Sequence, residues 1–159
     1  LADLALNAGR FDEARRRWEW AVARQREQGL PDEADTMPRF GLGAVAFEEH
    51  RLDDARRDFV AAYDLAGRAA FPNMAALALA GLAAVEAARG EAETAAIRAG
   101  QAWELMDRTG GEPRGNEATL FEFARSEAAA ALGDERFAEL LAEGRATPYE
   151  HTFPSDTPG

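Results

Sequence analysis

The hexapeptide His50-Arg51-Leu52-Asp53-Asp54-Ala55 has two close counterparts elsewhere in the chain. They are Gly9-Arg10-Phe11-Asp12-Glu13-Ala14 and Gly90-Glu91-Ala92-Glu93-Thr94-Ala95, and their closing alanines lie 41 (55 − 14) and 40 (95 − 55) residues apart. Each segment reads as a turn followed by the acidic first turn of a helix, where the helix dipole favours negative charge. A recurring unit of this length predicts a row of stacked helix pairs, each too small to bury its apolar side alone.

The similarity continues beyond the turns. Four residues after the closing alanines stand Trp18, Phe59 and Ala99, and three residues later Ala21, Ala62 and Ala102. Small residues let helices approach closely, and an aromatic ring fills the space between neighbouring pairs. The periodicity predicts an all-α chain with helices over 1–8, 11–28, 36–50, 52–69, 73–89, 92–108, 116–132 and 134–144. Thr36 is expected to cap the third helix, and the first helix of the fourth pair fits the repeat poorly.

The repeat resembles the tetratricopeptide repeat (TPR), which carries small and aromatic residues at fixed positions of a helix pair. The matching residues are Leu1-Ala2, Ala14, Trp18 and Ala21; Leu42-Gly43, Ala55, Phe59 and Ala62; and Leu79, Leu82-Ala83, Ala95, Ala99 and Ala102. The resemblance implies a right-handed α-solenoid of about four antiparallel helical hairpins over residues 1–145, the first truncated at its N-terminal end. Two features depart from that family. The period is 40–41 rather than 34 residues, and Ala99 replaces the aromatic, with Trp103 four residues later. HEAT-type repeats are the alternative architecture.

Units of this length are similar to the helical-repeat segments of large bacterial signalling ATPases and transcription regulators, as is the closing run from Ala131 to Ala138. This resemblance implies a non-enzymatic, cytoplasmic protein-interaction or sensor domain within a larger regulator. Its partner would be a protein segment or a neighbouring domain of the same chain, and homo-oligomerisation stays open. The alternatives are a small-molecule receptor with a pocket among Trp18, Phe40 and Phe47, or a free-standing scaffold.

The amino-acid composition disfavours binding to nucleic acids and membranes. The 159 residues include 37 alanines, no cysteine and no lysine, and the net charge is −11. Such an acidic surface disfavours direct contact with nucleic acids and anionic membranes, and no apolar run approaches the length of a membrane span. Because the chain opens at Leu1 inside a helical pattern, we expect a longer protein. Residues 146–159 are proline-rich and predict a disordered tail, unless Tyr149 and Phe153 dock as an extended segment.

No residue set specifies a reaction, so we predict no catalytic, cofactor-binding or metal site. His50 and His151 are the only histidines, and His50 reads as a polar turn residue. The arginine runs at 15–17 and 56–57 follow acidic residues within one turn, so local ion pairing is the simpler account, although a partner's carboxylates or phosphates remain an alternative. Gly41-Leu42-Gly43 lacks the context of a phosphate-binding loop, and close helix packing explains Gly43 better.

The first helix of each unit lines the ligand-binding groove in TPR proteins. The repeat register therefore predicts a partner-binding groove lined by Asp3, Asn7, Met37, Phe40, Ala44, Phe47, Glu48 and Leu77. Phe40 and Phe47 are seven residues apart and project from the same side of their helix. They either pack against the next hairpin or form an apolar floor for a peptide or helix. A lysine-based clamp for a C-terminal carboxylate is excluded because the chain has no lysine.

Overall fold

The computed structural model describes residues 1–147, and in that range it contains α-helices, one 3-10 helix and no strand. The elements are α1 (Ala2–Asn7), α2 (Phe11–Glu27), η1 (Asp32–Asp35), α3 (Thr36–Glu48), α4 (Leu52–Arg68), α5 (Pro72–Ala88), α6 (Ala92–Thr109), α7 (Asn116–Leu132) and α8 (Asp134–Ala146). The predicted all-α class is confirmed, and each predicted helix is present within a few residues of its expected bounds. The predicted tail falls almost entirely on residues 148–159, which lie outside the described residues.

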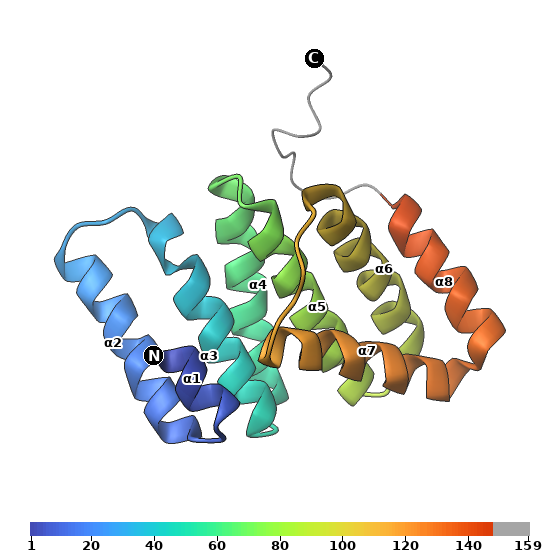
Figure 1. Ribbon diagram of the computed structural model, residues 1–159, viewed down its shortest axis with the longest axis horizontal. Coiled ribbons are helices and arrows are strands. Elements are labelled where there is room, and N and C mark those ends of the chain that lie inside the picture. Colours follow the sequence, from blue (N-terminus) through green and yellow to red (C-terminus); the bar gives the residue numbers. More distant parts are fainter. Residues whose placement is uncertain (148–159) are drawn as a thin grey trace, which may run out of the picture.

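Helices that follow one another in the chain pack side by side from α1 to α6. In Figure 1 these helices form a row, with α1, α3 and α5 as one set of neighbours. α2 and α4 are not closely packed on each other, so α3 lies between them. The last two helices depart from this arrangement, because α7 runs across the row and α8 packs mainly against α6.

The turns repeat as regularly as the helices. Gly9, His50 and Gly90 have φ of 70°, 58° and 80°, and they are spaced 41 and 40 residues apart. At each of these turns the residue that follows donates its backbone N–H to the carbonyl five residues earlier, as Arg51 does to Ala46 at 2.9 Å. This is a Schellman motif, which ends a helix with one residue in the left-handed region. The turns after α2, α4 and α6 use the same geometry at Gly29, Ala70 and Gly110.

Aromatic rings packed against glycine backbone hold neighbouring helices together. Phe59 of α4 is fully buried between α3 and α5, and a methyl group at Gly43 or Gly81 would approach its ring to 2.8 or 2.6 Å. A methyl group at Gly41 would overlap the indole of Trp18. Trp18 and Phe59 are 41 residues apart, so the same contact recurs with the repeat. The expectation that Gly43 serves close helix packing is confirmed.

The third unit replaces this contact with a crossing of two glycines. A methyl group at Gly144 of α8 would overlap the carbonyl oxygen of Ile97, and one at Gly100 of α6 would overlap that of Leu141. With Ala99 in place of an aromatic ring, the backbones of α6 and α8 approach directly. Trp103 instead packs edge-on against Phe121 of α7, with ring centroids 5.2 Å apart.

One local prediction was wrong. Thr36 is the first residue of α3 rather than its cap, and its hydroxyl donates to the carbonyl of Glu33 at 2.7 Å. That carbonyl belongs to η1, a single turn too short to show a hydrophobic period. In the second unit the helix expected from residue 73 begins at Pro72, and only three residues separate α4 from α5.

The Phe59 contact gives a first prediction. Gly81→Ala should lower the free energy of unfolding by about 1–3 kcal/mol, because the added methyl group overlaps the buried ring. Phe59→Leu in the same chain should recover part of that loss by making room. Urea unfolding of the two single variants and the double variant gives the coupling energy. Strictly additive losses would show that the two residues do not share one space.

Ala70 gives a second prediction, because a left-handed residue with a side chain is strained. Ala70→Gly should raise the free energy of unfolding by about 0.5–1 kcal/mol, the relief of strain exceeding the entropy that glycine adds to the unfolded chain. Ala69→Gly is the matched control, since Ala69 has φ −80° and gains no relief. Equal effects of the two substitutions in urea unfolding would contradict this account.

Candidate functional site

The residues predicted to line a partner groove lie on α1, α3 and α5, and α7 packs over the α5 end of this side. α7 packs against α5 and α6 and touches α1 at its N-terminal end. Figure 1 shows α7 crossing this part of the molecule, reached from α6 through the irregular segment 110–115. Part of the side that was predicted to bind a partner is therefore occupied by a helix of the same chain.

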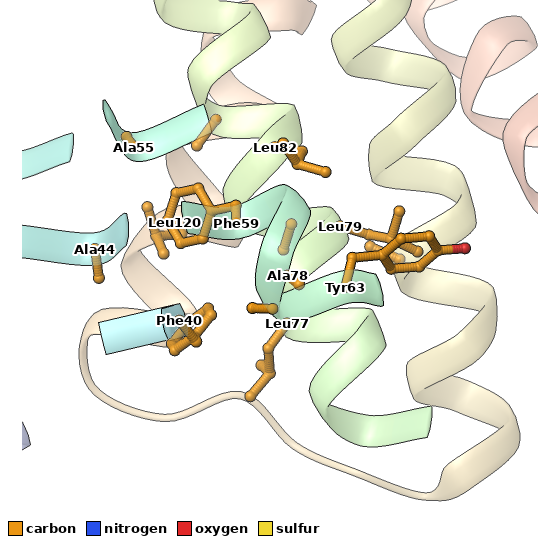
Figure 2. Packing of buried hydrophobic residues seen from close by; sticks show 14 of the residues in the cluster. Phe40, Ala44, Ala55, Phe59, Tyr63, Leu77, Ala78, Leu79, Leu82 and Leu120 are labelled. Carbon is orange, nitrogen blue, oxygen red and sulfur yellow. The ribbon is translucent and has the colours of Figure 1, made fainter. Parts of the chain in front are cut away.

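Three of the predicted groove residues lie in the core. Phe40, Ala44 and Leu77 are 3%, 0% and 7% exposed. The ring of Phe40 packs on that of Phe59 with centroids 5.6 Å apart, and Leu120 of α7 belongs to the same buried cluster (Figure 2). These three side chains are therefore inaccessible to a partner in this structure.

Three further residues lie along the N-terminal half of α7. Phe47 is half-buried and meets Phe123 of α7 edge to face, with ring centroids 5.2 Å apart. The side-chain oxygen of Asn7 accepts the backbone N–H of Asn116 at 3.0 Å. Asn7 and Glu48 also line a surface hollow of about 560 Å³ with residues of the α7 start. The groove prediction thus brought together residues that do meet one helix.

Asp3 and Met37, the remaining two, are exposed to solvent. What sequence reasoning missed is that α7 is the cover of this groove. Its buried residues Leu120, Phe121, Ala124 and Ala128 form one apolar stripe, which is the signal that marks a helix packed on a surface. α7 was expected to be the first helix of a fourth pair, so its apolar stripe was not matched to this side of the helix row.

A second hollow lies between α2 and α4, on the side away from the predicted groove residues. It measures about 350 Å³ and is lined by Glu19, Asp58, a few apolar side chains and five arginines. The arginines are Arg15, Arg26, Arg39, Arg51 and Arg57. Their charges are compensated by nearby carboxylates. Arg39 bonds Asp58 at 2.8 Å, and Arg15 pairs with both Asp12 and Glu49.

The predicted local pairing of the arginine runs is confirmed for Arg15, Arg17 and Arg57. Arg17 pairs with Glu13 at 2.7 Å, and Arg57 with Asp54 at 2.7 Å, each within one turn of its own helix. Exposed pairs of this kind stabilise a helix by only about 0.2–0.5 kcal/mol. The pairs from Arg15 to Glu49 and from Arg89 to Asp53 are different, because each connects a second helix of one unit to the end of the next helix.

One carboxylate lies in the interior. Glu86 of α5 is 5% exposed and accepts the Nε–H of Arg98 on both oxygens, at 2.8 and 2.9 Å. Burial raises the pKa of Glu86 above its ordinary 4.5, and the attraction of Arg98 only partly opposes this. Exposed Glu122 shows the opposite effect, because its hydrogen bond with Arg125 lowers its pKa. Glu86 has a structural partner and faces no hollow described above.

Among residues 1–147, no cluster of three potential metal-ligating side chains is present, and no helix has the length and apolar character of a membrane span. His50 occupies the exposed turn position described above. His151, Tyr149 and Phe153 lie outside the described residues.

Comparisons with known proteins supply no relative from which a function could be inferred. No protein family, no curated protein and no solved structure is significantly similar to the chain.

The raised pKa of Glu86 gives a third prediction. Because the folded state holds this proton more tightly than the unfolded state, the contribution of Glu86 to stability is greatest below about pH 4.5 and is lost as the pH rises through the folded pKa. The free energy of unfolding of the natural chain minus that of Glu86→Gln should therefore fall as the pH rises above about 4.5, through the raised pKa of Glu86.

Glu122→Gln is the matched control for this measurement. The pKa of Glu122 is lowered, so the corresponding difference should rise with pH and be lost as the pH falls through the folded pKa. Urea unfolding across the pH series measures both. A difference for Glu86 that rises with pH would show that the ion pair with Arg98 outweighs burial.

Proposed function

We propose that this chain is a non-enzymatic helical-repeat domain that binds an amphipathic helix of a partner protein or of a neighbouring domain. The fold would be a right-handed α-solenoid of the TPR-like kind, with a long unit of 40–41 residues. Its support is the recurrence of turns, ring-on-glycine contacts and buried positions at that spacing. Stacked repeats of this kind commonly expose one extended binding face.

A single observation supports the binding role most strongly: the groove side of α1, α3 and α5 already holds a helix. α7 buries Leu120 in the same cluster as Phe40 and Phe59, and it buries Phe121 against Trp103 of α6, with 1% and 4% exposed. Recognition of an apolar helix face in a hydrophobic groove is a general mode of protein binding. A surface complementary to α7 is therefore complementary to other helices with a similar stripe.

The proposed mechanism is exchange between α7 and the partner helix. α7 is joined to α6 by the irregular segment 110–115, which contains three glycines, and α7 has little contact with α8. A partner would shift the population toward a state with α7 released, by its greater affinity for that state. In a larger signalling or transcriptional regulator, this exchange would report partner binding to the other domains.

The small-molecule alternative has less support. Trp18, Phe40 and Phe47, which would line its pocket, pack against glycine backbone or other rings rather than a cavity. The arginine-lined hollow between α2 and α4 is polar and its charges are paired. An effector there would have to replace existing ion pairs.

The binding role is tested with α7 itself as the probe. In the full chain, Leu120→Asp with Phe121→Asp should release the internal helix, and a fluorescent peptide of residues 116–132 should then bind the open groove. The natural chain should bind this peptide at least about 10-fold more weakly, because its own α7 competes at high effective concentration.

A peptide with Arg125→Ala is the matched control, because Arg125 is exposed on α7 and its change should leave binding unaffected. Circular dichroism establishes whether the double variant stays helical. Should it unfold, amide hydrogen exchange of the natural chain decides: α7 must open more readily than α5. The proposal would be overturned if the double variant is helical but does not bind the peptide. It would also be overturned if α7 and α5 are equally protected from amide hydrogen exchange.

A further inference from the structure

The hollow between α2 and α4 gathers positive charge in an acidic chain. Five arginines and only two carboxylates line it, although the net charge of the chain is −11. Arg39 and Leu42 in this lining belong to α3, which lies between the two helices. A hollow lined mainly by one sign of charge concentrates ligands of the opposite sign. Its lining therefore favours an anion.

Four of the five arginines belong to one network of ion pairs. Three carboxylates each pair with two neighbouring arginines, so that every carboxylate has a guanidinium group on two sides. The network consists of Arg15–Glu49–Arg51, Arg51–Asp54–Arg57 and Arg57–Asp58–Arg39. Sharing of this kind holds several cations close together around one hollow, and a further anion among them would reduce their mutual repulsion.

The existing pairs leave part of the arginine donors available. Glu49 and Asp54 do not line the hollow, so they bind their arginines from outside it. Arg39 donates one Nη1–H to Asp58 at 2.8 Å, whereas a guanidinium group has five N–H donors. Arg26 lies 3.9 Å from the nearest oxygen of Asp35, which is beyond hydrogen-bond distance. The lining thus retains N–H groups that a ligand can use.

Competition with the carboxylates selects the kind of anion. Exposed ion pairs such as that of Arg57 with Asp54 contribute little to stability, so a ligand replaces one at small cost. A carboxylate ligand gains little in this exchange, because it offers the charge and the two oxygens that Asp54 already supplies. A phosphate monoester carries about −1.5 to −2 charges at pH 7 and three acceptor oxygens. Arginine binds such a group through two parallel hydrogen bonds.

We propose that the hollow between α2 and α4 binds a phosphate monoester. The phosphate contacts Arg39 and Arg57, which share Asp58, and Arg26 adds positive charge. The rest of the ligand lies against the apolar part of the lining, which includes Val22 and Leu42. A volume of about 350 Å³ suits a small phosphorylated molecule or a phosphorylated side chain. This site goes beyond the proposed function and does not depend on release of α7.

Isothermal titration of the full chain with phenyl phosphate at neutral pH and low salt tests the site. Phenyl sulfate is the matched probe, because it has the same shape and three terminal oxygens but a single negative charge, and benzoate represents a carboxylate. Both should bind at least about 5-fold more weakly than phenyl phosphate. The proposal would be overturned if phenyl phosphate shows no saturable binding, or if the three probes bind equally well.

Two arginine variants connect the binding to this hollow. Arg57→Gln and Arg26→Gln remove side chains that are 65% and 66% exposed, so both variants should remain helical in circular dichroism. Each should weaken phenyl phosphate binding at least about 5-fold. Arg125→Gln is the matched control, since Arg125 is an exposed, paired arginine on α7, and it should leave binding unchanged. Equal losses in all three variants would show a general charge effect and would contradict the proposal.

A carboxylate variant should have the opposite effect. Asp54→Asn removes the anion that Arg51 and Arg57 share outside the lining, so phenyl phosphate should bind at least about 3-fold more tightly. Glu122→Gln removes the same charge from α7 and should not change the affinity. Weaker binding by Asp54→Asn would show that the ligand does not compete with this carboxylate, and the choice of phosphate would fail.

Two further probes identify the source of the phosphate. A capped pentapeptide with one phosphoserine between glycines presents the group on a polypeptide, and glycerol 3-phosphate presents it on a small molecule. Tighter binding of the peptide would assign the hollow to a phosphorylated protein segment, and tighter binding of glycerol 3-phosphate to a small ligand. Binding of neither would overturn the proposal. Failure of the α7 peptide to bind its groove would leave this site unaffected.

Discussion

The contact between an aromatic ring and bare glycine backbone is the constraint on which the rest of this structure depends. Phe59 fills the space between α3 and α5 only because Gly43 and Gly81 leave room for it. Trp18 uses Gly41 in the same way one unit earlier. Burying a ring of this size removes a large apolar area from water, at roughly 25 cal/mol for each Å². The spacing of rings and glycines thus fixes which helix sides meet, and the turns connect helices already placed by packing.

Much of the fold could be predicted because its determinants are local and repeated. The acidic helix starts, the turns at Gly9, His50 and Gly90, and the alanines after them gave the helix bounds within a few residues. Even the non-glycine residue His50 was placed in a turn, because its neighbours matched the other units. η1 was missed because a single 3-10 turn has no period to detect. Thr36 was misassigned as a cap for the same reason, since the turn before it supplies the residue at that position.

The candidate site was harder to predict because its decisive feature is a long-range contact. The register placed Asn7, Phe47 and Glu48 on one side of the helix row, and in the structure Asn7 and Glu48 line one hollow while Phe47 meets Phe123. The register carried no information on what lies against these residues. The missing contact is made by α7, because Asn116 donates its backbone N–H to the side chain of Asn7, 109 residues earlier in the chain. The repeat had suggested a regular fourth pair there. The two glycines at 100 and 144 bring α8 onto α6 instead, and α7 is left to cross the row.

The ring-on-glycine contacts also have an evolutionary consequence. Each ring shares its space with backbone from another helix, so neither partner is free to change size by itself without loss of stability. A lineage in which position 81 acquires a side chain must first, or soon after, accept a smaller residue at position 59. Drift at these positions should therefore be concerted, with positions 18 and 41 covarying as one group and positions 43, 59 and 81 as another, although the exposed arginines and glutamates around them vary independently.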